Sequence, residues 1–241
     1  MSGLLLIQGA MDVETDWLIS RLEEAERLEI GGFSFWRGRV GPLALAVSRT
    51  EVGMVRAAAA TALGIQAFRP ALVLDQGTAG AHREDLHVGD IVVGRTCVDI
   101  QSAVTLHRVP GEGMCPEEWS LWDFQQDTPP VVYPGDPAWA VRFEAAFSPT
   151  GRVTGGRLGS GDLFSREHDR IHWLRERAGE DCEDMESAAV YRVCVQAGTP
   201  CLGLRIVSNN ELTGEPYRRE VGVDLQKFVL GVLMDWAEGV G

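Results

Sequence analysis

The feature that most constrains the fold is the alternation of short apolar runs with helix-forming stretches. Apolar runs of strand length occupy residues 4–7, 72–74 and 202–207, and stretches with helical spacing lie between them. Strands that alternate with helices favour a sheet with both faces covered. The sequence therefore predicts an α/β fold, a three-layer α/β/α sandwich around a mixed, twisted sheet. We expect one domain over residues 1–241, because no linker or internal repeat interrupts the pattern.

Several elements can be placed along the chain. A helix is predicted over 13–28, where Trp17, Leu18 and Leu22 recur at helical spacing, and a hairpin-like stretch follows from Gly31-Gly32 to residue 47. Further helices are predicted at 55–68, 168–177, from 186 and at 225–236, with strands at 88–93 and near Val153.

The segment 106–137 stands out, because it is rich in proline, glycine and acids and is long for a loop in a compact domain. It also carries Trp119, Trp122 and Phe124, which are poorly suited to a solvated loop. We expect these aromatic side chains to cover a pocket or to pack at a dimer interface.

Composition limits the class of function. The net charge is −13, from 35 acidic and 22 basic residues, which disfavours nucleic-acid binding because that requires a basic surface. The first apolar run has no basic leader and is too short to cross a bilayer, so neither a signal peptide nor a membrane span is predicted. These features favour a cytoplasmic protein with a small ligand.

The cysteines do not indicate a disulfide framework. There are five, an odd number, and none forms a CxxC pair of the kind that binds metal. We expect reduced, mostly buried thiols and no metal. The five residues are Cys97, Cys115, Cys182, Cys194 and Cys201.

Polar residues follow predicted strands or open predicted helices at three places. Glu14 follows a Gly-Ala-Met turn, Glu186 lies in DMES, and Asn209 lies in RIVSNNE. Open α/β sheets bind ligands at such positions, and the glycine-containing turn 76–82 would let a ligand approach the backbone. Each signal alone is weak, because such a glutamate is usually a solvated helix-start residue and Asn209 would also suit a helix N-cap.

The motifs gain specificity from their order. Together they resemble the nucleoside phosphorylase and nucleosidase superfamily, most closely the branch that hydrolyses 5'-methylthioadenosine and S-adenosylhomocysteine. This resemblance implies a nucleoside phosphorylase-like fold, a homodimer, no cofactor and a purine nucleoside as substrate, and it is weakest over 106–137. The motifs are GAMDVE (9–14), TEVGMVRAAAAT (50–61), LDQGTAGAH (74–82), VGDIVV (88–93), SGDLF (160–164), EDMESAAV (183–190) and RIVSNNE (205–211).

The resemblance also implies roles for particular residues. Glu14 falls on the carboxylate that activates water, and Glu186 on the one that accepts hydrogen bonds from the ribose hydroxyls. Met185 would pack near the sugar and Phe164 would stack on the purine. These assignments suit a reaction that passes through an oxocarbenium-like sugar. The remaining predicted substrate-binding residues are Thr78, Ala79, Gly80, Ser165 and Ser208.

Asn209 departs from the resemblance, since the methylthioadenosine nucleosidases carry aspartate there. An amide can donate or accept hydrogen bonds but cannot deliver a net proton. Its NH2 group can face the O6 oxygen of a 6-oxopurine while its oxygen accepts from a protonated N7. Asparagine in this role is known from 6-oxopurine-specific relatives, and related futalosine hydrolases act on a hypoxanthine nucleoside.

Three functions remain open from the sequence. Asp75 and Glu51 fall where phosphorylases need cations to hold phosphate, which favours hydrolysis to free base and ribose sugar. Arg49, Arg56 and Arg83 lie nearby in sequence and keep a phosphate-dependent phosphorylase possible. A nucleoside-binding protein with little catalysis is the third reading.

Overall fold

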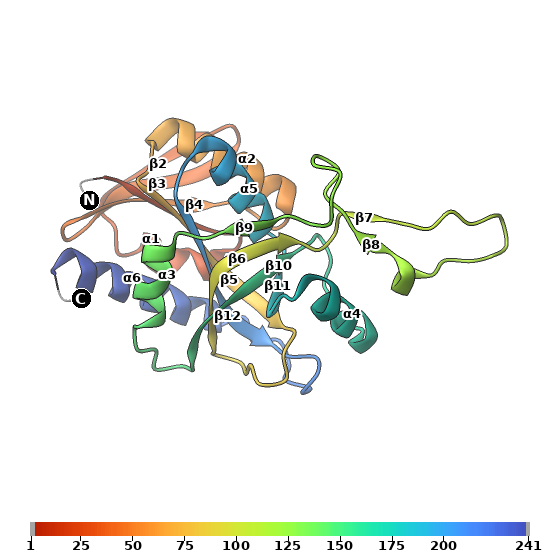
Figure 1. Cartoon of the computed structure of the whole chain (residues 1–241). Coiled ribbons are helices and arrows are strands. Elements are labelled where there is room, and N and C mark those ends of the chain that lie inside the picture. The colour runs from red at the N-terminus through yellow and green to blue at the C-terminus, as the bar shows by residue number, and fades with distance from the viewer. Residues whose placement is uncertain (1–2, 240–241) are drawn as a thin grey trace.

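The computed structural model describes residues 3–239 and has a mixed α/β architecture. Helices cover both faces of a ten-stranded sheet, so the three-layer prediction is confirmed (Figure 1). The strand order is β11-β10-β6-β12-β5-β1-β4-β3-β2, with β9 paired to β6. The central strands β12, β5, β1 and β4 are parallel, whereas β6 runs antiparallel to β12 and the β2–β3–β4 edge is antiparallel.

The strands of this sheet come from the whole length of the described chain. They are β1 (Leu5–Gly9), β2 (Glu23–Ile30), β3 (Phe33–Val40), β4 (Leu43–Arg49), β5 (Leu72–Ala81), β6 (Ile91–Asp99), β9 (Val132–Pro134), β10 (Val153–Ser160), β11 (Cys182–Asp184) and β12 (Cys201–Asn209).

The helices divide between the two faces. Figure 1 shows α2 (Met54–Phe68) and α5 (Ser187–Ala197) on one side of the sheet, with α3 (Pro137–Glu144) and α6 (Val221–Ala237) on the other. The short α1 (Asp16–Ile19) lies beside α6, and α4 (His168–Ala178) packs near the end of β6. All of the predicted helices after residue 50 are therefore present, with shifts of a few residues at their ends.

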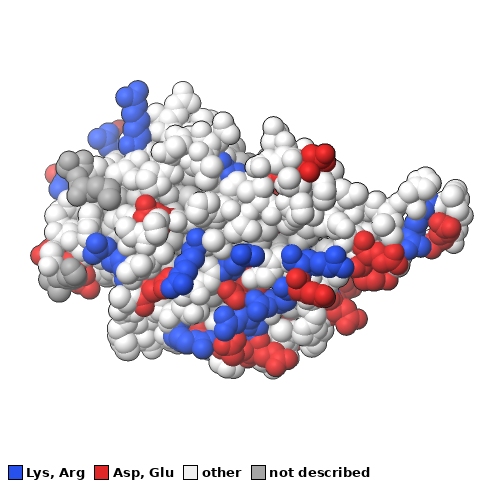
Figure 2. Space-filling view, viewed as in Figure 1, with Lys and Arg blue, Asp and Glu red and all other residues white. Residues whose placement is uncertain are grey.

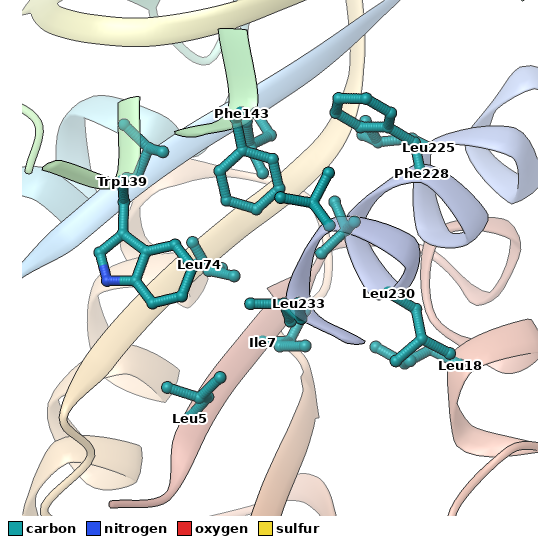
Figure 3. Packing of buried hydrophobic residues seen from close by; sticks show 14 of the residues in the cluster. Leu5, Ile7, Leu18, Leu74, Trp139, Phe143, Leu225, Phe228, Leu230 and Leu233 are labelled. Carbon is teal, nitrogen blue, oxygen red and sulfur yellow. The ribbon is translucent and has the colours of Figure 1, made fainter. Parts of the chain in front are cut away.

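Two apolar clusters hold the layers together, one on each face of the sheet. In Figure 3, Leu5, Ile7 and Leu74 of the sheet face Phe143 of α3 and Leu233 of α6. Burying such a side chain fully contributes about 2 kcal/mol. The α2–α5 face instead carries small residues, such as Ala57 and Ala188, which let the two helices approach the sheet closely.

The sheet curls so that three strand ends meet at Gly80. Strand β11 pairs in parallel with β10 and also antiparallel with β5, where Glu183 opposes Gly80. On the other side of β5, Asn209 of β12 opposes the same glycine. This closure gathers three of the sequence motifs at one edge of the sheet.

The predicted helix over 13–28 is wrong. The structure has a single turn of 3-10 helix (Asp12–Glu14) and the short α1, and residues 23–30 form edge strand β2 instead. Gly31 and Gly32 both have positive φ, 59° and 85°, which a tight two-residue hairpin between β2 and β3 requires. The hairpin therefore prevails over the weak helical spacing, and Leu28 and Ile30 alternate with exposed residues as in a strand.

Residues 103–131, called the arm below, extend away from the body (Figure 1). The arm contains the paired strands β7 (Ala103–Val104) and β8 (Ser120–Leu121) and a 3-10 turn (Pro116–Glu118). Leu121 packs with Leu174 of α4, and the Trp173 indole N–H donates to the carbonyl of Glu117 at 2.8 Å. The base of the arm is thus fixed to the body.

Charge is distributed unevenly over the surface. Figure 2 shows basic and acidic side chains intermixed over the body and acidic side chains gathered along one edge of the arm. No helix among residues 3–239 is long and apolar enough to cross a membrane.

Candidate active site

Glu14 has a fixed and nearly inaccessible carboxylate, with a residue exposure of 3%. Its Oε2 accepts hydrogen bonds from the backbone N–H groups of Ala10 and Met11 at 2.9 and 3.0 Å. Its Oε1 accepts from the N–H and the hydroxyl of Thr78 at 2.8 and 3.0 Å. Four donors on three residues therefore fix the orientation of this carboxylate, and Thr78 contributes by holding Glu14.

A buried arginine that the sequence reasoning missed lies behind this glutamate. Arg205 is 1% exposed, and its guanidinium pairs with Asp75 Oδ2 at 2.6 Å and with Asp184 Oδ2 at 2.8 Å. A Cβ on Gly77 would lie 3.1 Å from both Arg205 Nη1 and Glu14 Oε1. Glycine at this position therefore lets the cation and the carboxylate share the space beside β5.

Asp75 has a structural role at the site that the sequence does not reveal. It is buried, accepts a hydrogen bond from the Ser187 hydroxyl at 3.1 Å, and forms an ion pair with Arg205. Burial raises the pKa of Asp75 to about 6, although the charge of Arg205 opposes the shift. Its role is to hold the arginine, and Glu51 is itself paired with Arg56 on the surface.

Glu186 is the second buried carboxylate of the site, with an exposure of 8%. It precedes α5, and its Oε1 accepts a hydrogen bond from the backbone N–H of Gly53 at 3.0 Å. Its Oε2 lies 4.0 Å from Arg205 Nη2. Burial, followed by the charges of Asp184 and Glu14, raises the pKa of Glu186 to about 8 despite the opposing charge of Arg205.

Gly53 connects a second sequence motif to the site. Its φ of 109° is a conformation that L side chains rarely adopt, so the TEVG turn needs glycine there. The turn presents its N–H to Glu186 and the next one, from Met54, to Asp162 at 2.8 Å. The loop before α2 and the loop after β10 are thereby joined at the edge of the site.

Asn209 ends strand β12 with its amide directed toward Gly80. Its Nδ2 would lie 3.3 Å from a Cβ built on Gly80, and its Oδ1 lies 3.0 Å from the Ser208 hydroxyl oxygen. The Ser208 hydroxyl is also 3.1 Å from the carbonyl oxygen of Ala79. Asn209 is not a helix N-cap, because residues 211–214 form a turn and not a helix; Asn210 stabilises that turn, with its Oδ1 accepting from the N–H groups of Leu212 and Thr213.

The loop between β10 and α4 carries Phe164 and Ser165. Phe164 is 51% exposed, so nothing within the described chain fully covers its ring. The Ser165 N–H and hydroxyl both donate to the carboxylate of Glu183, each at 2.9 Å. The side chain of Ser165 is thus used to fix the loop, and Met185 lies half-buried between Asp184 and Glu186.

The structure therefore assembles two groups of predicted residues at the ends of neighbouring strands. Glu186 lies 4.0 Å from Arg205, and Thr78 holds Glu14 in place, while Asn209, Ser208 and Gly80 lie where β12 meets β5. One sequence signal could have identified Arg205, because an arginine within the apolar run LGLRIV is rarely buried unless it is paired.

Comparison with known proteins identifies the family. A sequence model described as the phosphorylase superfamily matches residues 5–229. The chain belongs to the phosphorylase superfamily. It is 32% identical over 234 residues to the 5'-methylthioadenosine/S-adenosylhomocysteine nucleosidase of Geobacillus kaustophilus, a match that covers 92% of this chain and 88% of the relative.

Solved structures show the same fold. A 5'-methylthioadenosine/S-adenosylhomocysteine nucleosidase from Neisseria meningitidis, in complex with methylthio-immucillin-A, has a TM-score of 0.79 at 24% identity and covers 96% of this chain and 98% of its own. The futalosine hydrolase of Helicobacter pylori has a TM-score of 0.78 at 22% identity, with coverage of 97% and 98%. At these identities the likeness concerns the fold.

Proposed function

We propose that this protein hydrolyses the N-glycosidic bond of a purine nucleoside to a free base and a ribose sugar. The observation that carries the proposal is the pair of buried carboxylates, Glu14 and Glu186, both held near the buried Arg205 at the carboxyl ends of parallel strands. The similarity to methylthioadenosine/S-adenosylhomocysteine nucleosidases over most of the chain supports the same reaction class.

In the proposed reaction Glu14 accepts a proton from the attacking water as the water oxygen bonds to C1′ of the ribose. The electron pair of the broken C–N bond remains with the base, which leaves as an anion and takes a proton from solvent water, while Glu14 returns its proton to solvent. General-base catalysis of this kind is worth roughly 10²–10⁴-fold. The backbone N–H groups of Ala10, Met11 and Thr78 keep the Glu14 carboxylate oriented, and the Thr78 hydroxyl, which can rotate away, gives up its acceptor position to the attacking water.

Glu186 and the base-binding residues complete the proposal. Glu186 accepts hydrogen bonds from the ribose hydroxyls, and Met185 packs beside the sugar. Phe164 stacks on the purine, and its exposure leaves a ring face available for this contact. Asn209 faces the purine near N7, with Ser208, Ala79 and Gly80 shaping the same edge of the sheet.

Phosphate dependence is less well supported than hydrolysis. The sequence offers three arginines that could bind phosphate, and each of them is already paired with an acid. Arg49 pairs with Asp16, Arg56 with Glu51, and Arg83 with Asp85. A phosphate ion would have to break one of these pairs.

The test is a panel of nucleosides assayed with and without phosphate. The panel contains inosine, adenosine, methylthioadenosine, methylthioinosine, S-adenosylhomocysteine and futalosine. Release of free base and free sugar in phosphate-free buffer supports the proposal. Strict dependence on phosphate would establish a phosphorylase, and binding without release of base would establish a nucleoside-binding protein.

We also propose a cytoplasmic homodimer acting in nucleoside catabolism or methionine salvage. All five cysteines are free thiols and four of them are buried, which suits a reducing compartment. The arm exposes large apolar side chains, among them Met114 and Phe124, which a second copy would cover. Sedimentation velocity tests the dimer, and a monomer at micromolar concentration would contradict it.

A further inference from the structure

Helix α2 begins at the edge of the site without a capping side chain of its own. Its N-cap residue is Gly53, which has no side chain, so the first N–H groups of the helix need acceptors from elsewhere. Asp162, in the loop after β10, accepts the Met54 N–H at 2.8 Å, and Glu186 accepts the Gly53 N–H at 3.0 Å. Two carboxylates from different parts of the chain therefore cap α2 together.

The loop that carries Asp162 is fixed to the rest of the protein. The Asp162 N–H donates to the side-chain oxygen of Gln101, just before the arm. The N–H of the preceding Gly161 donates to the carbonyl of Asp184 in β11 at 3.1 Å. Gln101 is itself held, because its N–H donates to Asp99 Oδ1 at 2.9 Å. Asp162 therefore has a fixed backbone from which its carboxylate reaches α2.

The TEVG turn (50–53), in contrast, has a backbone that must be held in place. Glu51 and Gly53 have positive φ, 61° and 109°, and for Glu51 this left-handed conformation is uncommon. Backbone of this kind persists where the surrounding contacts fix it. A Cβ on Gly53 would lie 3.1 Å from Asp162 Oδ1, so the carboxylate lies directly against the turn. The contact with Asp162 thus fixes the turn whose N–H reaches Glu186.

We propose that Asp162 is a positioning residue, which holds the TEVG turn so that the Gly53 N–H stays directed at the Glu186 carboxylate and keeps that carboxylate ready to bind the ribose. The binding of ribose by Glu186 rests on the proposed function. Asp162 acts through the turn and not by contact with the substrate.

The Gly53 hydrogen bond matters because Glu186 is difficult to ionise. Burial raises the pKa of Glu186 to about 8, and the charges of Asp184 and Glu14 add to the rise, while the charge of Arg205 and the Gly53 N–H oppose it. A hydrogen bond to the ionised form of a carboxyl lowers its pKa. Loss of the Gly53 N–H would therefore leave less of Glu186 ionised at neutral pH.

Positioning and charge have opposite effects on Glu186, so they can be separated. Asp162→Ala removes an acidic charge, and this alone would lower the pKa of Glu186 by relieving repulsion. If Asp162 holds the turn, the same variant raises that pKa, because the Gly53 N–H is released. Asp162→Asn removes the charge but keeps an oxygen that can accept the Met54 N–H. The direction of the change therefore distinguishes the two effects.

The first experiment follows the ionisation of Glu186 by NMR titration of protein that is isotope-labelled at the glutamate side-chain carboxyl carbons. The variant Glu186→Gln identifies the Glu186 signal. The midpoint should rise by about one pH unit in Asp162→Ala, as expected for a lost hydrogen bond to a charged group, and should not rise in Asp162→Asn.

The matched control is Glu167→Ala, which removes an exposed charge further along the same loop and should follow the wild type. A midpoint that is unchanged or lower in Asp162→Ala would overturn the proposal. Because the titration needs no cleavage, this result is independent of whether the protein is a hydrolase.

The second experiment connects the position of the turn to the reaction. The value of kcat/KM for Asp162→Ala is divided by that of the wild type from pH 7 to pH 10, on the best-cleaved nucleoside of the panel, so that ionisation of the substrate cancels. Asp162→Ala should be about tenfold slower at pH 7 and nearly equal to the wild type at pH 10, where both proteins ionise Glu186. Asp162→Asn should stay close to the wild type throughout.

The dependence on pH distinguishes positioning from general damage to the structure. An equal loss of kcat/KM in Asp162→Ala at every pH, or no loss at any pH, would refute the proposal. A raised titration midpoint of Glu186 in Asp162→Ala, without cleavage of any nucleoside by the wild type, would support the positioning role and refute the proposed function alone.

Discussion

Replacing Glu186 with glutamine should abolish most turnover and yet change how stability depends on pH. The carboxylate is proposed to hold the ribose, so the uncharged amide removes an acceptor from the transition state. The same carboxyl is buried beside Asp184 and Glu14, which is unfavourable for its ionised form. Function and stability therefore make opposite demands on this residue.

The size of the stability effect follows from the pKa. Glu186 shifts from 4.5 to about 8, and each unit is equivalent to about 1.4 kcal/mol, so its ionisation costs at most about 5 kcal/mol of folding free energy. Between these two values the folded protein holds a proton that the unfolded chain has lost. The contribution of Glu186 to the free energy of unfolding therefore falls as pH rises. It stops falling above about pH 8.

Guanidinium unfolding at pH 6, 7, 8 and 9 measures the effect. Asp75 contributes with the same sign, but mainly below pH 6, because its pKa is about 6. The wild type should lose at least about 1 kcal/mol across this range, and Glu186→Gln should lose less. Glu26→Gln, which removes an exposed charge from edge strand β2, is the control and should follow the wild type. Parallel curves for wild type and Glu186→Gln would refute the reasoning.

Three further predictions address the rest of the site. Glu14→Gln should retain the fold and ligand binding but lower kcat by roughly 10²-fold or more; wild-type rates would disprove its role as the base. Asn209→Asp should move the kcat/KM ratio toward 6-amino substrates by about 1 kcal/mol or more, measured on inosine and adenosine. Replacing Trp119, Trp122 and Phe124 with alanine should weaken nucleoside binding or dimer formation, and a triple variant with unchanged KM and sedimentation would contradict the assigned role of the arm.

Much of the fold could be predicted because its signals are local. The buried strands β1, β5 and β12 appear as apolar runs, and α2 shows helical spacing between Gly53 and Pro70, as the last stretch of the chain does over α6. The error over 13–28 arose where helical spacing competed with a hairpin. Gly31-Gly32 marks the hairpin in the sequence, but in the strand before it only Leu28 and Ile30 are partly buried. An edge strand that is mostly solvated carries little apolar alternation.

The candidate site could be predicted in its chemical groups but not in its supporting contacts. Glu14, Glu186 and Asn209 follow strands or open helices, which the pattern along the chain reveals. Arg205 and its pairing with Asp75 depend on register between β12 and β5, which single-sequence periodicity does not contain. The sequence predicts that Phe124 covers a pocket or packs at a dimer interface. In a single chain its side chain is 67% exposed, so this role stays a prediction.

The surroundings of Asn209 bear on how the base can leave. Asn210 donates its amide to the carbonyls of Arg83 and Leu86, and Glu211 lies 3.4 Å from the Arg166 guanidinium, so both neighbours are already engaged. Asn209 itself cannot transfer a net proton. A 6-oxopurine can place the electron pair of the broken bond on O6, where an amide N–H stabilises it by a hydrogen bond alone. A 6-aminopurine has no such oxygen and depends on protonation of N7. The site as built therefore favours the 6-oxopurine in the transition state and not only in binding.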